Sequence, residues 1–577
     1  MNPALASTLQ LVAVLFVLAV VYVPLGDYMA RVFTSLRDLA PERWFYRAVR
    51  VDSKRQQTWS GYAAATLSFA FVGVVVLYLL QRLQSHLPMS GGKPGVTPAI
   101  AFNTAVSFVT NTNWQSYSPE AVMSNFSNMA GLAVQNFVSA AVGIAVAVAL
   151  IRGLIARKGD GQIGNFWVDL TRSVFRILLP LAILVAVILL TQGVVQSFRS
   201  GFGFTNLDGS SGHALVGPFA SQEAIKELGT NGGGTYAANS AHPFENPTPL
   251  SNVVEIIALL IIPVCLTRTY GTMVGDRRQG NTILGVMASL FAVILAITWW
   301  FEEHTHGVAA KAAGAMMEGK EQRFGIPGSA LFAVATTGTS TGAVNAQHDS
   351  FSAAGGGAVI WNMLLGEVAP GGTGTGLYGM LILAIIAVFV GGLLVGRTPH
   401  FLGKKIGQHE VTMAALSILV MPALVLTGTA ITMVLNSTTG FLGNSGDHGS
   451  PSAMHGYSEV LYAFTSASNN NGSAFGGLTV TSDWFQASLG FCMLLGRYLP
   501  IIFTLALAGR LAMQQPKSEV VADAKAPRST RVRAESVATL PTHGLLYGAL
   551  LFGTVVLVAG LTFFPALALG PIAEALS

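Results

Sequence analysis

Four polar stretches of the chain combine Asn, Thr, Ser and Gly in a similar order, and each follows a short, partly apolar segment. Asn113 and Gly232 stand 119 residues apart, Gly232 and Gly342 stand 110 apart, and Gly342 and Gly472 stand 130 apart. A period of roughly 120 residues indicates a fourfold internal repeat. The candidate site residues are Asn111, Thr112, Asn113, Trp114, Gln115, Asn231, Gly232, Gly233, Gly234, Ser340, Thr341, Gly342, Ala343, Ser468, Asn469, Asn470, Asn471 and Gly472.

These stretches offer neutral oxygen ligands. Rings of backbone carbonyls replace the hydration shell of a monovalent cation in potassium channels, whereas rings of acidic side chains suit other cation pores. Glycine lets successive carbonyls face one way, and the short preceding helices would turn their negative dipole ends toward the ion. One such loop would be an ordinary polar loop, but four favour an ion site. The residues therefore predict a site for a monovalent cation, with potassium favoured over magnesium or calcium.

Two charged residues lie near these loops in apolar surroundings. Arg497 follows the fourth loop in Leu494-Leu495-Gly496-Arg497, and Glu367 follows the third loop. A charge inside a membrane helix is costly and marks a functional site by default. Arg497 is predicted to face the pore below the loops, where it would oppose leak or turn the ion sideways. The alternatives are a structural ion pair with Glu367, and a solvated Glu367 at the loop end.

The elements that position these loops are membrane helices. Of the 577 residues, 51% are hydrophobic and only 10% are charged, which points to lipid as the solvent. A helix needs about 20 apolar residues to cross a bilayer. Ten segments meet this length, and the predicted fold class is an all-α integral membrane protein with four helix–pore-loop–helix repeats. The segments are 4–25, 62–80, 128–151, 173–197, 250–270, 282–302, 375–396, 411–435, 486–510 and 544–565.

The repeats set the predicted domains. An extra N-terminal helix occupies 1–28 and a C-terminal helix occupies 543–577. A charged cytoplasmic connector, 513–542, precedes the last helix. The four pore repeats are 60–152, 172–272, 281–397 and 410–512.

Basic residues predict the orientation. Of the 32 Lys and Arg residues, 24 lie in or beside the five loops opposite the polar stretches. Basic loops stay in the cytoplasm. Both termini and the four polar loops are therefore predicted to lie outside. Cys265 and Cys492 are predicted to be buried and unpaired, and His242, His348 and His455 to pack or form hydrogen bonds.

The polar stretches also carry a family resemblance. Thr110–Tyr117, Asn239–Pro247, Gly342–Ser350 and Ser468–Phe475 closely resemble the potassium-binding subunit of the bacterial Kdp potassium-transporting ATPase, the KdpA family, and the resemblance runs along essentially the whole chain. That family belongs to a superfamily of potassium transporters with four pore-loop repeats. Thr341 departs from the Cys expected in many relatives, which bears only on fine selectivity.

The resemblance implies a function and partners. It implies a multi-pass subunit of the bacterial inner membrane that binds potassium from outside and passes it through an intersubunit tunnel to KdpB, a P-type ATPase, in a complex with KdpC and the small KdpF. Gln115 and Gly232 match positions regarded as setting ion affinity, and Arg497 matches the pore arginine. Potassium is the ligand, and no covalent cofactor or nucleic acid is implied.

Alternatives differ in what energises transport. The chain has no Walker A motif and no Asp-Lys-Thr-Gly phosphorylation motif, so it is predicted to have no catalytic site of its own. A stand-alone potassium channel or ion-coupled symporter of the same superfamily is the second hypothesis. A membrane enzyme is disfavoured because the loops lack a nucleophile, base and acid arrangement or a metal cluster.

Overall fold

The computed structural model describes residues 3–305, 316–435, 451–515 and 541–576. Among the described residues, ten helical spans are long and apolar enough to cross a membrane, which confirms the predicted all-α fold. They are α1 (Pro3–Thr34), α3 (Trp59–Arg82), α6, η2 and α7 together (Asn125–Ser127, Asn128–Leu132, Ala133–Ile155), α8, η3 and α9 together (Phe166–Arg172, Ser173–Leu178, Leu179–Thr191), α11 (Pro249–Val274), α12 (Arg277–His304), α16 (Thr375–Leu394), α17 (Gln408–Val434), α19 (Asp483–Met513) and α21 (Leu545–Leu569).

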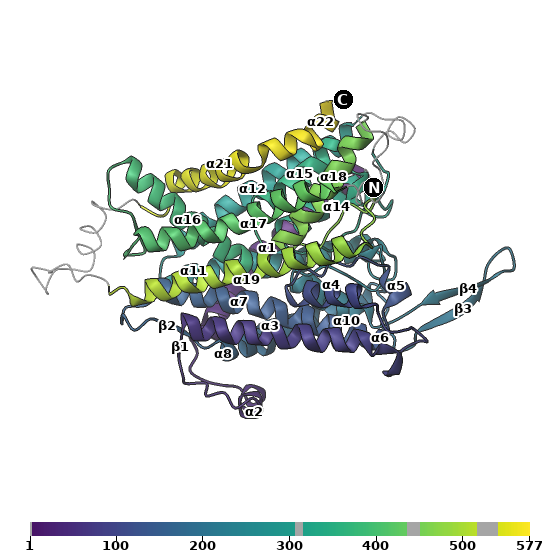
Figure 1. Ribbon diagram of the computed structural model, residues 1–577, viewed down its shortest axis with the longest axis horizontal. Coiled ribbons are helices and arrows are strands. Elements are labelled where there is room, and N and C mark those ends of the chain that lie inside the picture. The colour runs from purple at the N-terminus through teal and green to yellow at the C-terminus, as the bar shows by residue number, and fades with distance from the viewer. Residues whose placement is uncertain (1–2, 306–315, 436–450, 516–540, 577) are drawn as a thin grey trace, which may run out of the picture.

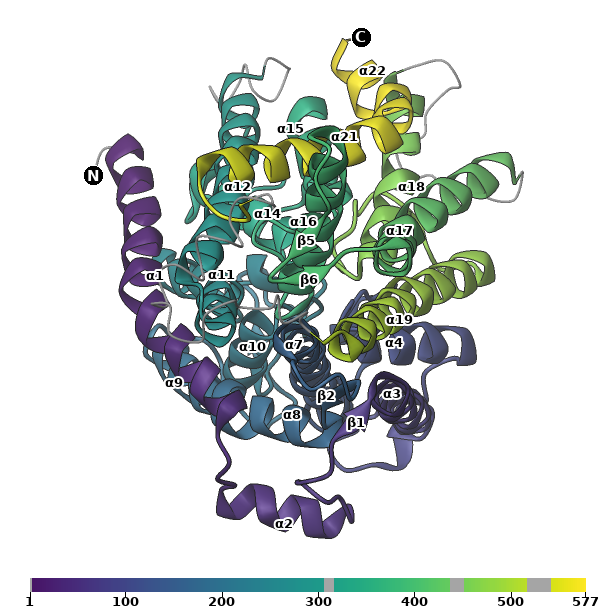
Figure 2. The ribbon, with the colours of Figure 1, turned by 90° about the vertical axis from the view of Figure 1, so that its left-hand side faces the viewer.

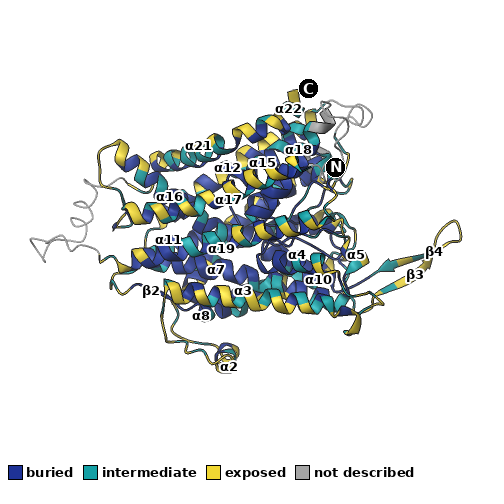
Figure 3. Ribbon diagram, viewed as in Figure 1, coloured by how far each residue is buried: buried dark blue, intermediate teal, exposed yellow. Residues whose placement is uncertain are grey.

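The long helices lie side by side along the long axis of the molecule (Figure 1). Viewed along that axis, α7 lies near the middle and the other helices surround it (Figure 2). The most apolar stretch of the span that contains α7 is 83% buried, whereas that of α1 is 17% buried. Outer helices such as α3 and α21 alternate buried and exposed faces (Figure 3). The apolar exposed faces are therefore those that lipid would cover, and α7 is the central support.

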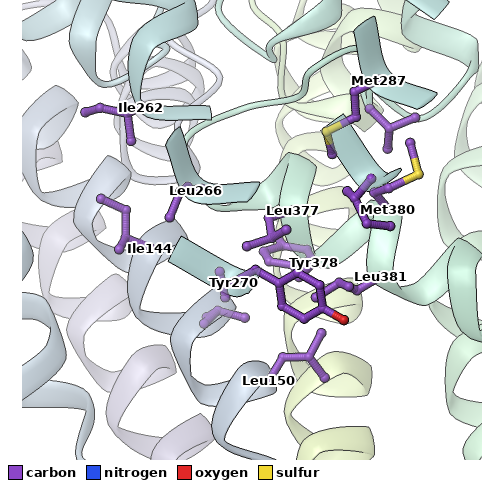
Figure 4. Close-up of a cluster of buried hydrophobic side chains, with 14 of the residues drawn as sticks. Ile144, Leu150, Ile262, Leu266, Tyr270, Met287, Leu377, Tyr378, Met380 and Leu381 are labelled. Atoms are coloured by element: carbon purple, nitrogen blue, oxygen red, sulfur yellow. The ribbon is translucent and has the colours of Figure 1, made fainter. Parts of the chain in front are cut away.

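The core joins α7, α11, α12 and α16. Figure 4 shows Ile144, Leu150, Leu266, Met287 and Met380 converging from these four helices. The cluster contains many alanines of α7, which are at most 1% exposed and let neighbouring helices approach closely. Small residues at helix contacts are the usual means of close packing in membranes, where apolar burial gives no driving force between helices.

Four shorter helices precede the polar loops, as the repeat predicts. They are α4 (Pro98–Val109), α10 (Phe219–Leu228), α14 (Gly325–Gly338) and α18 (Pro451–Asn469). All four lie toward the end of the bundle where α1 begins and α22 (Pro571–Leu576) ends (Figure 1). Each therefore enters the bundle from one end and leaves its polar loop inside it.

Several boundaries and elements differ from prediction. Helix α1 continues nine residues past the predicted end at 25, and α9 ends at Thr191 instead of 197. The polar Gln192-Gly193 pair explains that early end. Most of the predicted connector at 513–542 lies outside the described residues, which end at 515 and resume at 541. Elements absent from the prediction are α2 (Ala40–Ala48), α5 (Pro119–Val122), α15 (Ala353–Leu364), the short helices η1 (Gln84–His86), η4 (Asn239–Ala241) and η5 (His348–Ser350), and three two-stranded sheets, β1 (Gln57–Thr58) with β2 (Gln162–Gly164), β3 (Gly201–Thr205) with β4 (Ser211–Leu215), and β5 (His400–Phe401) with β6 (Lys404–Lys405).

A buried ion pair locks α7 to α8 at the end of the bundle opposite the pore loops. Arg152 donates two hydrogen bonds to the carboxylate of Asp169, at 2.6 and 2.9 Å. The Tyr62 hydroxyl of α3 donates to the same carboxylate at 3.1 Å. Asp169 is fully buried, so this group joins three helices through one charge.

Removing that charge is expected to destabilise the chain. Asp169→Ala leaves Arg152 without its partner, and breaking one side of a buried pair costs roughly 3 kcal/mol. Thermal unfolding of the purified protein in detergent would measure the loss. The control is Glu303→Ala, which removes an exposed carboxylate and should leave the melting temperature unchanged. Equal melting temperatures for the two variants would contradict the assigned role.

Candidate ion site in the four pore loops

All four pore helices end with the same backbone turn. Just beyond each helix, one or two residues after its last residue, the backbone adopts a left-handed conformation. The following residue donates its N–H to the carbonyl five positions back. This hydrogen bond satisfies a carbonyl at the helix end that would otherwise be free. The left-handed residues are Asn111, Thr230, Ser340 and Asn470, with φ of 68°, 49°, 52° and 60°. The donors Thr112, Asn231, Thr341 and Asn471 lie 2.9, 3.0, 3.1 and 2.9 Å from the oxygens of Ser107, Lys226, Thr336 and Ser466.

The loops approach one another at their glycines. A Cβ on Gly232 would lie 2.9 Å from the carbonyl oxygen of Thr341 in loop three. A Cβ on Gly342 would overlap the carbonyl oxygen of Asn471 in loop four. Only glycine permits such close backbone contact.

Loop four makes the same kind of glycine-to-carbonyl contact with loop one, and hydrogen bonds join loop one to loop two. A Cβ on Gly472 would overlap the carbonyl oxygen of Thr112. Loop one then meets loop two where the Gly232 N–H donates to Asn113 Oδ1 at 3.3 Å and the Gly234 N–H donates to Gln115 Oε1 at 3.1 Å. The loops therefore form a closed ring in chain order.

Four equivalent carbonyl groups in this ring have no hydrogen-bond partner among the described residues. Within the described part of the chain, no hydrogen bond reaches the backbone oxygens of the four residues that follow the left-handed turn. These residues, Thr112, Asn231, Thr341 and Asn471, are all 0% exposed. A buried carbonyl without a partner is costly, and a bound cation would remove that cost. The ring thus presents oxygens of the kind that coordinate a dehydrated monovalent cation.

Side-chain amides hold neighbouring loops together, and the prediction that Asn, Thr and Ser also offer oxygens to the ion stays a prediction. Asn111 Nδ2 donates to the carbonyl of Thr230 at 2.8 Å, which joins loops one and two. Asn470 Nδ2 donates to Thr112 Oγ1 at 2.9 Å, which joins loops four and one. Asn469 Nδ2 instead donates to Thr465 within its own helix, at 3.0 Å.

The central helix α7 supplies two residues that the sequence reasoning missed. Asn136 accepts a hydrogen bond from Asn113 Nδ2 on Oδ1 and one from Asn231 Nδ2 on its backbone oxygen, both at 2.8 Å. The Ser139 hydroxyl donates to Asn111 Oδ1 at 2.7 Å. Their signal in the sequence is two polar residues, three apart, within an apolar helix, which places both on one face.

The remaining loop residues pack around the ring. Trp114 is buried in an apolar cluster with Val106 of α4 and Phe464 of α18. Its carbonyl accepts a hydrogen bond from Ser107 Oγ at 2.8 Å. Gln115 links loop two to the hydroxyl of Tyr117, at 3.1 Å. The predicted residues of all four stretches thus lie in or directly against one ring.

Loop two is supported by a buried charge cluster. Lys226 on α10 is fully buried and lies 2.6 Å from Glu223 and 3.5 Å from Glu227. Burial raises the pKa of Glu227 and of nearby Glu245 to about 8. Burial opposes the charge of Lys226, but the surrounding carboxylates outweigh it and hold its pKa above the usual value. The ammonium group therefore stays charged.

Asn239 connects this cluster to the ring. Its Oδ1 accepts from Lys226 Nζ at 2.9 Å and from the Val344 N–H of loop three at 3.4 Å. Its Nδ2 donates to the carbonyl of Gly233. Asn239 is outside the predicted site, although it lies in a stretch singled out by the sequence.

Replacing Asn239 is expected to loosen loop two. Asn239→Ala removes four hydrogen bonds, including one from the Ser240 N–H, and leaves Lys226 short of one partner. Ion affinity should therefore fall roughly tenfold while the fold persists. Rubidium uptake at graded concentrations would measure it. The control is Asn206→Ala in the exposed β3–β4 turn. Unchanged affinity in Asn239→Ala would show that the loop holds its position without this bridge.

Glu367 and Arg497 line one cavity beside the ring. The cavity has a volume of about 140 Å³, and Ser340, Asn470 and Tyr378 also line it. Glu367 is 2% exposed, so the solvated-carboxylate interpretation is wrong. It accepts hydrogen bonds from the Ser340 hydroxyl and from Asn471 Nδ2, the latter at 2.8 Å. Glu367 therefore ties loops three and four together.

Arg497 on α19 is buried and donates to the backbone oxygen of Ser139 at 3.4 Å. It forms no ion pair with any carboxylate in the described ranges, Glu367 included. The alternative of a structural ion pair between Arg497 and Glu367 is therefore not seen in the described residues. A buried guanidinium whose charge is unpaired lies beside the ring and faces the same cavity as Glu367.

The cysteines and histidines follow prediction. Cys265 and Cys492 are buried and unpaired. His348 Nδ1 lies 2.9 Å from the Tyr462 hydroxyl. The ring of His242 stacks on the ring of Tyr236, with the two ring centres 3.5 Å apart. Burial opposes a charge on His455, but Asp349 and Glu574 outweigh it and raise its pKa to about 10.

The fold and the ring define a class, the membrane proteins built from four helix–pore-loop–helix repeats around a common centre. The potassium transporter TrkH from Vibrio parahaemolyticus shares this fold at 15% identity, with a TM-score of 0.51 over 78% of this chain and 85% of that one.

The particular family follows from the sequence comparisons. Residues 12–576 match the model of the potassium-transporting ATPase A subunit, and the chain belongs to this KdpA family. It is 68% identical to the potassium-transporting ATPase potassium-binding subunits of Rhodococcus erythropolis and of Nocardia farcinica, over 100% of both chains in each case. It is 54% identical to that of Streptomyces coelicolor, also over 100% of both chains.

Proposed function

We propose that this chain is the potassium-binding and translocating subunit of an ATP-driven potassium uptake complex. The observation that carries the proposal is the ring of four buried, unpartnered carbonyls on four equivalent loops. Family membership gives the ion its identity, because the relatives are named as potassium-binding subunits. The eighteen predicted loop residues are the proposed filter, with the backbone oxygens as ligands and the amides as braces.

Orientation follows from charge. The basic loops gather at the end of the bundle opposite the pore loops, and such loops stay in the cytoplasm. The filter then opens outward, in the inner membrane of a bacterium, with both termini outside. Each of the four proposed pore repeats contributes one loop to the ring.

The partners are inferred from the family resemblance and from what the sequence lacks. The chain carries no Walker A or Asp-Lys-Thr-Gly motif, so a partner must supply ATP hydrolysis. KdpB, a P-type ATPase, is the proposed source, with KdpC and KdpF. This chain is then a non-catalytic subunit.

The route to the partner is proposed to leave the ring sideways. The cavity next to the ring is bounded by Glu367, Arg497 and the helices α16, α17 and α21. A buried positive charge disfavours a cation passing close to Arg497, whereas Glu367 favours one. The ion would therefore be turned toward the side of the bundle.

The competing function is a stand-alone channel or ion-coupled symporter, the second hypothesis that the sequence leaves open. The test is rubidium uptake at micromolar potassium in an uptake-deficient bacterium that makes this chain with or without its partners. Uptake that needs the partners supports the subunit. Uptake by the chain alone would leave a self-sufficient transporter.

A substitution in the same assay tests whether the ion site lies in the pore loops. Gly232→Asp puts a carboxylate against the carbonyl of Thr341 and should weaken uptake strongly. Gly92→Asp adds the same charge at an exposed loop position with open space around it and should not. Equal uptake by both variants would move the ion site away from the loops.

A further inference from the structure

The segment between α1 and α3 carries a concentration of unpaired positive charge. Residues 26–61 contain seven Lys and Arg residues and four Asp and Glu residues. Three of the acids are paired with arginines elsewhere in the chain: Asp27 with Arg268, Asp38 with Arg172, and Glu42 with Arg176. None of the seven cations forms an ion pair within the described residues. Only Asp52 is left to offset them.

Two of these cations border a pocket at the start of α3. Arg50 and Arg55 line it together with Asp52, Asn165 and Trp167, and it has a volume of about 450 Å³. The Asp52 carboxylate accepts a hydrogen bond from the Lys54 N–H at 2.9 Å. Asn165 Nδ2 is held by the backbone oxygens of Arg55 and Asp52, at 2.9 and 3.3 Å. The pocket wall is thus fixed, and neither guanidinium group forms an ion pair with the part of the chain that the structure describes.

Helix α2 has the features of a helix that lies at a membrane surface. It stands apart from the bundle beside β1 and α8 (Figure 2). Glu42 and Tyr46 face the protein and are buried, whereas Trp44 is 70% exposed between Arg43 and Arg47. A strongly amphipathic helix with Trp and Arg on its free face is typical of the interface between headgroups and acyl chains.

We propose that the pocket binds the phosphate of an anionic phospholipid. A guanidinium group donates paired hydrogen bonds of the kind that a phosphate accepts, and two arginines line this pocket. Gly61 lines the pocket at the start of α3, and farther along that helix Phe71 and Val72 are 70% and 57% exposed. The acyl chain of a lipid can therefore lie along α3 while its phosphate stays in the pocket. A soluble phosphate has no acyl chain to make this second contact.

Titration of the purified full chain with phosphatidylglycerol, monitored by native mass spectrometry, tests the site. The variant is Arg50→Gln with Arg55→Gln. The matched control is Arg157→Gln with Lys158→Gln, which removes two exposed cations at the same end of the bundle. We expect the Arg50/Arg55 variant to bind phosphatidylglycerol roughly tenfold more weakly and the control to bind like the wild type. Phosphatidylcholine should bind equally weakly to all three.

Three results would overturn the proposal. One is unchanged phosphatidylglycerol affinity in the Arg50/Arg55 variant, and another is an equal loss in the control, which would indicate general attraction to charge. The third is glycerol phosphate binding as tightly as the lipid, which would indicate a site for a soluble anion. Both arginines are exposed, and an equal melting temperature in phosphatidylcholine would establish that the variant is folded.

Discussion

Gly342→Ala is expected to abolish high-affinity uptake. Its φ of 79° is strained for any residue with a Cβ, and that Cβ would overlap the carbonyl oxygen of Asn471. The left-handed backbone costs about 1 kcal/mol and the overlap with rigid backbone roughly 2 more. Together these correspond to about a hundredfold loss of affinity. Rubidium uptake by the assembled complex over a range of concentrations measures it.

A second glycine separates backbone strain from crowding. Gly275 ends α11 with a φ of 77°, and a Cβ there would meet nothing within 4 Å. Gly275→Ala therefore carries the same conformational cost without the overlap, and affinity should be unchanged. If both variants lose affinity equally, strain alone explains the effect and close contact between loops three and four is not required.

Arg497→Met is expected to uncouple transport from the partner. Removing the one charge that α19 brings beside the ring lowers the barrier to a cation in the cavity, so rubidium should pass through without ATP. Coupled uptake at micromolar potassium should fall at least tenfold, and passive efflux from preloaded cells should rise. Both fluxes can be measured in the same strain.

The control for this change lies on the same helix. Arg510 is exposed near the end of α19, and Arg510→Met removes an equal charge away from the ring. It should leave both fluxes unchanged. Coupled uptake that stays normal in Arg497→Met would make the arginine a packing residue, held by its contact with Ser139.

The spans and the repeat were predictable because their signals are local. Apolar length marks each membrane helix, and the Asn, Thr and Gly pattern recurs at a near-constant interval. Hence the candidate residues of all four loops converge in the structure.

Contacts between distant residues were not predictable. Asn136 and Ser139 stand out as polar residues on one face of an apolar helix, but the sequence does not say what they contact. Only the packing of α7 at the centre brings them to Asn113 and Asn111. Glu367 was open to three interpretations, because its environment is made by loops three and four together. The role of the asparagine amides as braces likewise depends on partners more than 100 residues away, as for Asn111 and Thr230.

The most direct test of the account is to locate the ion. Crystals of the assembled complex soaked in thallium, a heavy potassium mimic, would give an anomalous peak at each occupied site. We predict a peak inside the ring, coordinated by the backbone oxygens of Thr112, Asn231, Thr341 and Asn471. A ring without thallium, with peaks only beside Glu367 or elsewhere in the membrane, would contradict the claim that the four loops form the binding site.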